Sequence, residues 1–235
     1  MIFPEPMKKG ESYQIHVEYE GNKVVNKEGG GTYAIGARTA WYPALNAFQD
    51  RAIYDLTFKI PKGNTMVSVG RLEKEWKEDN FACSHWVTET PLAVAGFNFG
   101  QFKMKTVEDE PTKYSLEGYA TQEVPDYLKG HGFGNMAPSV MIQNAVIDAQ
   151  NSMRLFTAWF GPLPYGRLAV TMQPEFNFGQ SWPTLVYLPV TAFLDSTQRW
   201  SLMGTGAFKF AEFIQEVTPH EVSHQWWGHM VGFAT

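Results

Sequence analysis

The sequence predicts an α+β protein in which an antiparallel β-sandwich or saddle comes first and a helix-containing domain follows. Three observations predict this class. Short segments of alternating apolar and polar residues fill the first half, a long amphipathic helical pattern opens the second half, and a histidine motif with helical spacing lies near the C-terminus. A strand-rich first half and a helix-containing second half indicate two domains that meet near residue 110, so we expect a β-rich domain over residues 1–110 and a second domain over residues 111–235.

The composition is that of a globular protein and excludes several classes. Of the 235 residues, 44% are hydrophobic and 18% are charged. A net charge of -5 without a cluster of Lys or Arg argues against a nucleic-acid partner. Cys83 is the only cysteine, so neither an intramolecular disulfide nor a cysteine-rich metal site is expected.

The sequence indicates no membrane segment within this chain. It contains no apolar run of the roughly eighteen residues that a membrane span needs, and its first residues do not have the pattern of a signal peptide. The compartment therefore stays open. An extracytoplasmic or membrane-associated location remains compatible with a longer natural protein.

Alternation and turn composition predict several short strands in the first half. The strand at 65–69 is expected to form a hairpin with the strand before it, across the turn Pro61-Lys62-Gly63. Gly29-Gly30-Gly31 is expected to be a loop tip. The predicted strands cover residues 13–19, 53–60, 65–69, 86–88, 102–107 and 114–119.

The second half is expected to begin with a helix. Its apolar positions follow three-four spacing as far as Phe160, Ser139 is the expected N-cap, and Gly161-Pro162 ends the pattern. Residues 174–183 have a turn composition. Buried strands are expected at 168–172 and 184–188, and a helical pattern at 206–216 is expected to end or kink before Pro219.

The motif His220-Glu221-Val222-Ser223-His224 has the His-Glu-x-x-His spacing of a zinc peptidase. On a helix the two histidines lie about 40° apart and Glu221 lies roughly 60° from His224, so both imidazoles can reach one Zn2+ ion. A structural alternative also fits, because Thr218, Pro219 and Glu221 form a good helix start with a capping box. Both readings require a helix here.

A hydrolytic zinc site needs three protein ligands and an open position for water. We expect His220 and His224 to be ligands and Glu221 to activate the zinc-bound water as general base and later protonate the leaving amine. His229 would lie about 180° around the helix from His220, and Glu212 and Glu216 would have to fold back. The third ligand is therefore expected beyond Thr235.

The stretch 218–232, which includes Gln225-Trp226-Trp227-Gly228, resembles zinc metallopeptidases of the aminopeptidase N type, which are gluzincins. Segments 41–43, 50–52, 58–63 and 160–165 also resemble that family. The resemblance implies that the second domain is the first part of a thermolysin-like catalytic domain. It also implies that the third ligand is a glutamate that would fall at position 243, with an oxyanion-stabilising tyrosine further on.

The resemblance implies a substrate site that this chain alters. The family carries Gly-x-Met-Glu-Asn beside the metal, where the glutamate binds the free amino group of the substrate. The matching candidate substrate-binding residues here are Gly179, Gln180, Ser181 and Trp182, with no glutamate at the expected place. Glu175 is a possible replacement, so exopeptidase or endopeptidase specificity stays open.

Two functions are therefore expected. The first is zinc-dependent, aminopeptidase-like hydrolysis of a peptide substrate, and the alternative is a catalytically degenerate peptide-binding or interaction module on the same scaffold. With only two ligands, this chain alone is expected to bind zinc weakly and to turn over little. Apolar surface meant for further residues is expected to favour self-association.

Overall fold

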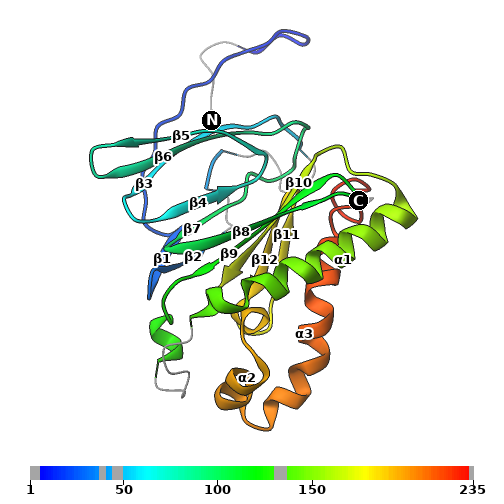
Figure 1. The fold of residues 1–235 in the computed structure, drawn as a ribbon. Helices are drawn as coiled ribbons and strands as arrows, with labels where there is room; N and C mark the ends of the chain where they lie inside the picture. Colours follow the sequence, from blue (N-terminus) through cyan, green and yellow to red (C-terminus); the bar gives the residue numbers. More distant parts are fainter. Residues whose placement is uncertain (1–5, 37–40, 44–49, 130–136, 233–235) are drawn as a thin grey trace.

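A computed structural model describes residues 6–36, 41–43, 50–129 and 137–232. Figure 1 shows strands in the N-terminal half and helices α1, α2 and α3 in the C-terminal half. The predicted α+β class is confirmed. Within the described residues the largest sheet has five strands, and this sheet positions the histidine motif.

The N-terminal strands form small antiparallel sheets. One sheet pairs β1 (Val25–Gly29) with β2 (Thr32–Ile35), and another pairs β4 (Thr65–Ser68) with β7 (Phe97–Gly100). A three-stranded sheet has the order β3 (Asp55–Pro61), β6 (Phe81–Val87) and β5 (Arg71–Glu78). Most of these strands are short and end at turns, which is the arrangement that short alternating segments bounded by turn residues predict.

The five-stranded sheet is mixed. Its order is β11 (Gln180–Trp182), β12 (Leu185–Pro189), β10 (Arg167–Gln173), β9 (Tyr114–Thr121) and β8 (Phe102–Asp109). The three middle strands run parallel to one another, whereas β11 and β8 are antiparallel edge strands. Strand β8 precedes residue 110 and pairs with β9, which follows it. Strand β11 forms the edge that lies beside the histidine motif.

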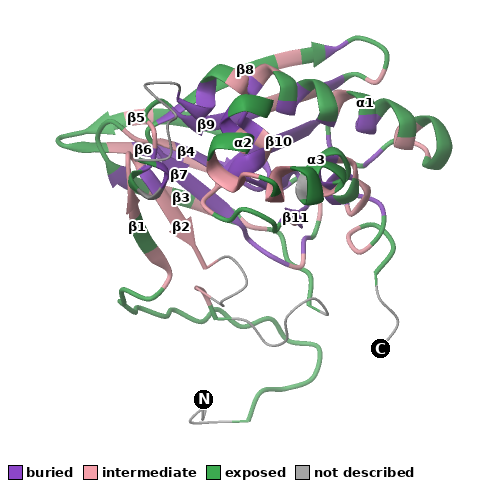
Figure 2. Cartoon of the chain, turned by 90° about the horizontal axis from the view of Figure 1, so that it is seen from below, coloured by how far each residue is buried: buried purple, intermediate pink, exposed green. Residues whose placement is uncertain are grey.

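The middle strands are buried on both faces, because successive side chains point to opposite faces and pack into two different cores. On β10, Leu168 and Val170 pack with the helices, whereas Ala169 packs with Val67 of the N-terminal strands. Figure 2 shows the resulting layer of buried strands. Trp182 belongs to the N-terminal core, so its ring points away from the helices.

Three α-helices occur in the described part of the chain. They are α1 (Ile142–Phe160), α2 (Ser196–Met203) and α3 (Gly206–Ser223), with short 3-10 turns η1 (Asp126–Leu128), η2 (Pro138–Met141) and η3 (Val190–Phe193). None of the helices in the described ranges is long and apolar enough to cross a membrane.

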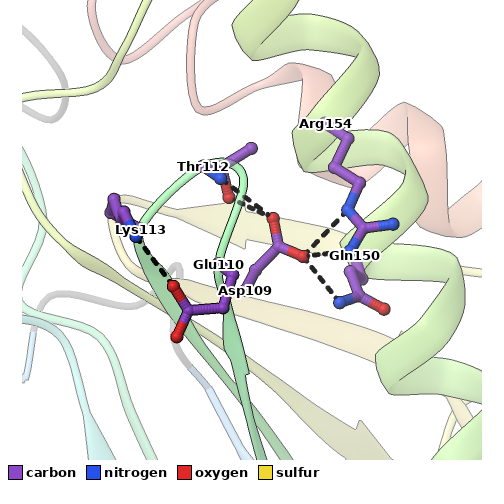
Figure 3. A network of polar contacts seen from close by, with 6 residues as sticks. All are labelled: Asp109, Glu110, Thr112, Lys113, Gln150 and Arg154. Atoms are coloured by element: carbon purple, nitrogen blue, oxygen red, sulfur yellow. Dashed lines mark hydrogen bonds and ion pairs between the residues drawn. The ribbon is translucent and has the colours of Figure 1, made fainter.

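Asp109, at the end of β8, fastens the β8–β9 turn to α1 (Figure 3). Its carboxylate accepts hydrogen bonds from Arg154 and Gln150 on α1 and from Thr112 in the turn. Burial opposes ionisation, but these hydrogen bonds and the Arg154 charge outweigh it and lower the pKa of Asp109 to about 2.

Several local predictions for the N-terminal half were wrong. Residues 13–19 form no strand, because their apolar side chains, such as Ile15 and Tyr19, are exposed and meet no sheet. Strand β4 pairs with β7 and not with β3, so the predicted hairpin is absent. The expected loop tip at Gly29-Gly30-Gly31 is confirmed as the tight connection of a β1–β2 hairpin that was not predicted.

The helix starts also differ from prediction. Ser139 lies in η2 and does not cap α1, whose N-cap is Met141 without a side-chain bond. Helix α3 runs without interruption from Gly206 to Ser223, so Pro219 lies inside it and Thr218 is not an N-cap. The alternative reading of this stretch as a helix start is therefore wrong. Residues 180–182 form β11 where a turn composition was noted.

Candidate active site

The last turn of α3 brings the two histidines of the motif together. His220 and Glu221 lie in that turn, and His224 follows directly as the C-cap residue, still with helical backbone angles. The imidazole ring centroids of His220 and His224 are 4.9 Å apart and their planes cross at 89°. Val222 of the helix end and Trp226, which follows the helix, pack into the core that α1 also lines. The histidines therefore face the opposite side.

A backbone carbonyl determines the tautomer of His224. Its Nδ1 lies 2.9 Å from the carbonyl oxygen of Trp227. Because a carbonyl oxygen only accepts hydrogen bonds, Nδ1 carries the proton in the neutral ring and Nε2 carries the lone pair. Metal-binding histidines are commonly oriented in this way by a bond from their other nitrogen. The described contacts of His224 thus fit a metal ligand.

Glu221 is buried beside the histidines, with only 6% of its surface exposed. Its carboxylate packs against the backbone of Gly179, where a Cβ atom would lie 2.4 Å from Glu221 Oε1. Only a glycine leaves room for the carboxylate in this position. Gly179 comes directly before β11, so the edge of the sheet limits where the Glu221 side chain can lie.

These residues line a cavity of about 360 Å³ between α3 and the segment that leads into β11. It has an apolar side, and its charged lining residues are carboxylates, with no Lys or Arg among them. The lining residues are Asn177, Phe178, Gly179, Gln180, Phe213, Glu216, Val217, His220, Glu221 and His224.

Two of the four predicted substrate-binding residues line this cavity. Gly179 and Gln180 are on its wall, whereas Ser181 and Trp182 are not. Ser181 is 2% exposed and Trp182 is 1% exposed, and the Trp182 ring lies in the core of the opposite sheet face. Successive residues of a strand point to opposite faces, so Ser181 faces Gln225 and Trp182 faces the other core, but the turn composition of this stretch did not reveal the strand.

Sequence reasoning did not assign Glu216 or Phe213 to the site. Glu216, His220 and His224 repeat every four residues and so occupy one stripe of the helix. That spacing was visible in the sequence and could have placed Glu216 on the cavity wall. Glu175, the suggested replacement for the missing glutamate, is exposed and is not among the lining residues.

His229 does not line the cavity. Its Nε2 lies 3.1 Å from the carbonyl oxygen of Ser181 on β11, and burial lowers the pKa of His229 to about 4. Because α3 ends at Ser223, the chain turns and carries His229 to the strand. In the described part of the chain, no group of three or more His, Cys, Asp or Glu side chains is arranged to hold a metal ion.

Comparison with known proteins identifies the fold. No protein-family profile and no curated protein matches the chain. Among solved structures, an M1 zinc metallopeptidase from Deinococcus radiodurans aligns with 86% of this chain and 41% of its own, with a TM-score of 0.59 and 16% identity. This chain has the fold of part of an M1 zinc metallopeptidase.

Two further M1 structures support the same fold. A mutant two-domain M1 zinc metallopeptidase bound to L-arginine aligns over 82% of this chain and 38% of its own, with a TM-score of 0.57 and 16% identity. A mutant of the Deinococcus radiodurans enzyme bound to a Tyr-Ser-Ala substrate aligns over 78% and 36%, with a TM-score of 0.52 and 15% identity. The chain thus spans about two-fifths of the length of these structures.

Proposed function

We propose that this chain carries part of the active site of a zinc-dependent peptidase. In this proposal His220 and His224 are metal ligands and Glu221 is the general acid/base. The observation that carries it is the shared cavity, in which both imidazoles and the Glu221 carboxylate meet. The hydrogen bond from His224 Nδ1 to Trp227 supports the proposal because it leaves Nε2 as the metal-binding nitrogen.

Each residue of the motif has a stated task in this chemistry. Zinc, when bound, would polarise the scissile carbonyl and make water a nucleophile near neutral pH. Glu221 would take a proton from the attacking water and later pass it to the nitrogen of the leaving amine. Gly179 would keep the Glu221 carboxylate in place, since its missing side chain leaves the space that the carboxylate fills.

We propose a peptide with a free amino terminus as the substrate. Glu216 lies about 6 Å along the helix from His220, which is one turn, and is suited to pair with an ammonium group. The apolar lining residues Phe178, Phe213 and Val217 can contact the first side chain of the peptide. Among the described lining residues no lysine or arginine is placed to hold a terminal carboxylate, which favours aminopeptidase over carboxypeptidase action.

Hydrolysis of short peptides by the zinc-loaded protein tests this proposal, with the protein extended through any residues that its gene encodes after Thr235. Glu221→Gln should lower kcat/KM by at least about 100-fold, the range of general acid–base catalysis. Glu212→Gln is the matched control, because Glu212 lies on the same helix but does not line the cavity. Full activity of Glu221→Gln contradicts the proposed role.

Two further measurements address the substrate and the third ligand. Glu216→Gln should raise KM for peptides with a free amino terminus and leave hydrolysis of N-acetylated peptides unchanged. The gene sequence after Thr235 should encode a glutamate at position 243. Its absence there contradicts the proposed three-ligand site.

The burial of Trp182 favours a second function, a peptide-binding module with degenerate catalysis. In the family pattern its position carries the glutamate that binds the substrate amine, and here it is 1% exposed. Peptide binding without zinc-dependent turnover in the extended protein is the expected result for such a module. Measurable hydrolysis that depends on Glu221 excludes it.

Self-association of the 235-residue chain is a separate proposal. Large apolar side chains on α1 and α3 are open to solvent, with Trp159 71% exposed and Phe208 73% exposed. Sedimentation at increasing concentration should show oligomers. A monomer at all concentrations contradicts this expectation.

A further inference from the structure

A buried junction centred on Thr184 and Gln225 connects the N-terminal strands to the end of α3. Thr184 connects β11 to β12 and is 3% exposed. Its φ is +69°, in the left-handed region that β-branched residues rarely adopt. Such a conformation persists only where surrounding contacts enforce it.

All three polar groups of Thr184 bond to different parts of the fold. Its N–H donates to Gln225 Oε1 at 2.9 Å, and its Oγ1 accepts from the N–H of Gly70 at 2.7 Å. Its carbonyl oxygen accepts from the N–H of Ala169 on β10 at 2.9 Å. One residue therefore joins the β4–β5 turn, the central sheet and the segment after α3.

Gln225 is fully buried and uses its entire hydrogen-bonding capacity. Its Oε1 accepts from the Tyr165 hydroxyl at 2.7 Å as well as from Thr184. Its Nε2 donates to Ser181 Oγ at 2.7 Å and to the Trp182 carbonyl at 2.9 Å. An amide has two donors and two acceptor positions, so these four bonds allow a single orientation.

This junction lies one peptide bond from His224. After Ser223 the backbone continues as a turn in which the N–H groups of Trp226 and Trp227 both donate to the Ser223 carbonyl oxygen. The side-chain contacts of Gln225 then fix where this turn lies against the sheet. Gln225 ties it to the β11–β12 turn, and the Trp227 carbonyl then orients the His224 ring. The orientation of the His224 ring therefore depends on the Gln225 contacts, because they hold the turn that carries the Trp227 carbonyl.

The N-terminal strands reach the same junction through Gly70. Arg167 on β10 donates to the carbonyl oxygens of Ser68 and Gly70 and pairs with Glu117, so the β4–β5 turn is held against the central sheet. Because the turn is held in this way, the Gly70 N–H is kept in position to donate to Thr184 Oγ1. The contact spans 114 residues of sequence.

We propose that Thr184 and Gln225 are positioning residues that hold His224 in a metal-binding geometry, and that the β4–β5 turn supports them. This inference rests on the proposed function, since it concerns the same histidine pair. The hydroxyl of Thr184 has the specific task of accepting the Gly70 N–H and so anchoring the residue whose backbone N–H bonds Gln225. Its loss should loosen His224 without removing any ligand.

The sharpest test compares Thr184→Val with Thr184→Ser. Valine keeps the β-branched shape and the left-handed strain but lacks the hydroxyl, whereas serine keeps the hydroxyl. Zinc affinity, measured by competition with a chromophoric chelator, should fall about tenfold in Thr184→Val, the lower range for residues that support metal ligands. Thr184→Ser should stay within about threefold of wild type, and Gln225→Met should lose at least as much as Thr184→Val.

A core variant separates positioning from general stability. Val146→Ala creates a cavity between α1 and β9, away from the junction, and should lower the melting temperature while leaving zinc affinity unchanged. If Val146→Ala and Thr184→Val weaken zinc binding in proportion to their loss of stability, the proposal is wrong. It is also wrong if Thr184→Val binds zinc as wild type does.

Nitrogen NMR of the metal-free chain separates failure of this inference from failure of the proposed function. The wild-type ring of His224 should show a protonated Nδ1, and in Thr184→Val its tautomers should mix. A wild-type protein that binds no zinc when extended past Thr235 contradicts the proposed function alone, and the NMR comparison still decides on the junction. Should Gln225→Met not fold, Thr184→Val and Thr184→Ser carry the test. An unchanged His224 spectrum in Thr184→Val overturns the inference.

Discussion

Replacement of Gly179 by alanine should displace the Glu221 carboxylate, the proposed general acid/base, while leaving both histidines in place. The added Cβ would lie 2.4 Å from Glu221 Oε1, 2.6 Å from Cγ and 2.7 Å from Cδ, whereas ordinary contacts begin at 3.4 Å. To reach an ordinary contact at 3.4 Å from its present 2.4 Å, the Glu221 carboxylate must move by about 1 Å. Because the side chain is 6% exposed, little open space is available for this movement.

The expected loss is in catalysis more than in stability. A shift of about 1 Å in a catalytic group costs roughly 100-fold in rate, or about 2.7 kcal/mol of transition-state stabilisation. The carboxylate is the far end of a flexible side chain, so the loss in free energy of unfolding should be only about 1 kcal/mol. Zinc affinity should not change, because no atom of His220 or His224 is among the three that the new Cβ would meet most closely.

The assay is kcat/KM for peptide hydrolysis by the zinc-loaded protein, in the extended form described for Glu221→Gln, with zinc content and melting temperature measured in parallel. Gly166→Ala is the control, because a Cβ there meets nothing within 4 Å. The reasoning fails if Gly179→Ala keeps wild-type kcat/KM. It also fails if activity is lost only together with zinc.

Three further predictions concern stability and are measured by urea unfolding of the 235-residue chain. Asp109→Asn should cost about 1–2 kcal/mol at pH 7, a figure reduced for solvent screening because Arg154 is 44% exposed. Since the pKa of Asp109 is lowered to about 2, this stabilisation is present above about pH 4 and is lost as the pH falls towards 2, so wild type and variant should converge there. Burial lowers the pKa of His229 from 6.5 to about 4, so the unfolded chain binds the proton more readily and stability should fall by about 2 kcal/mol between pH 7 and pH 5. Most of that decrease should disappear in His229→Gln, and an equal decrease in the variant contradicts the assignment. Gly118→Ala should cost about 1–3 kcal/mol because its Cβ would lie 2.5 Å from Val146 Cγ2, and a neutral effect would show that α1 can move away from β9.

The local periodicity of apolar residues predicted several strands and the first long helix of this fold. Strand β3 and helix α1 were expected from alternation and from three-four spacing, and both occur within a few residues of the expected ranges. The strand predicted for residues 13–19, which does not form, shows the limit of this reasoning. Its alternation is as regular as that of β3, but a strand also needs a partner and a buried face, and neither is encoded within the segment.

The sequence by itself determined the local part of the site. The backbone positions of His220, Glu221 and His224 are about one helical turn apart, so their spacing follows from helix geometry once a helix forms. The orientation of the His224 ring also depends on the Trp227 carbonyl. Only the tertiary structure decided which other groups meet them. The packing of Gly179 against Glu221, the burial of Trp182 and the contact between Gly70 and Thr184 join segments that are tens of residues apart. Contacts at such separations depend on how the sheets pair and pack, and no short-range pattern of side chains specifies that pairing.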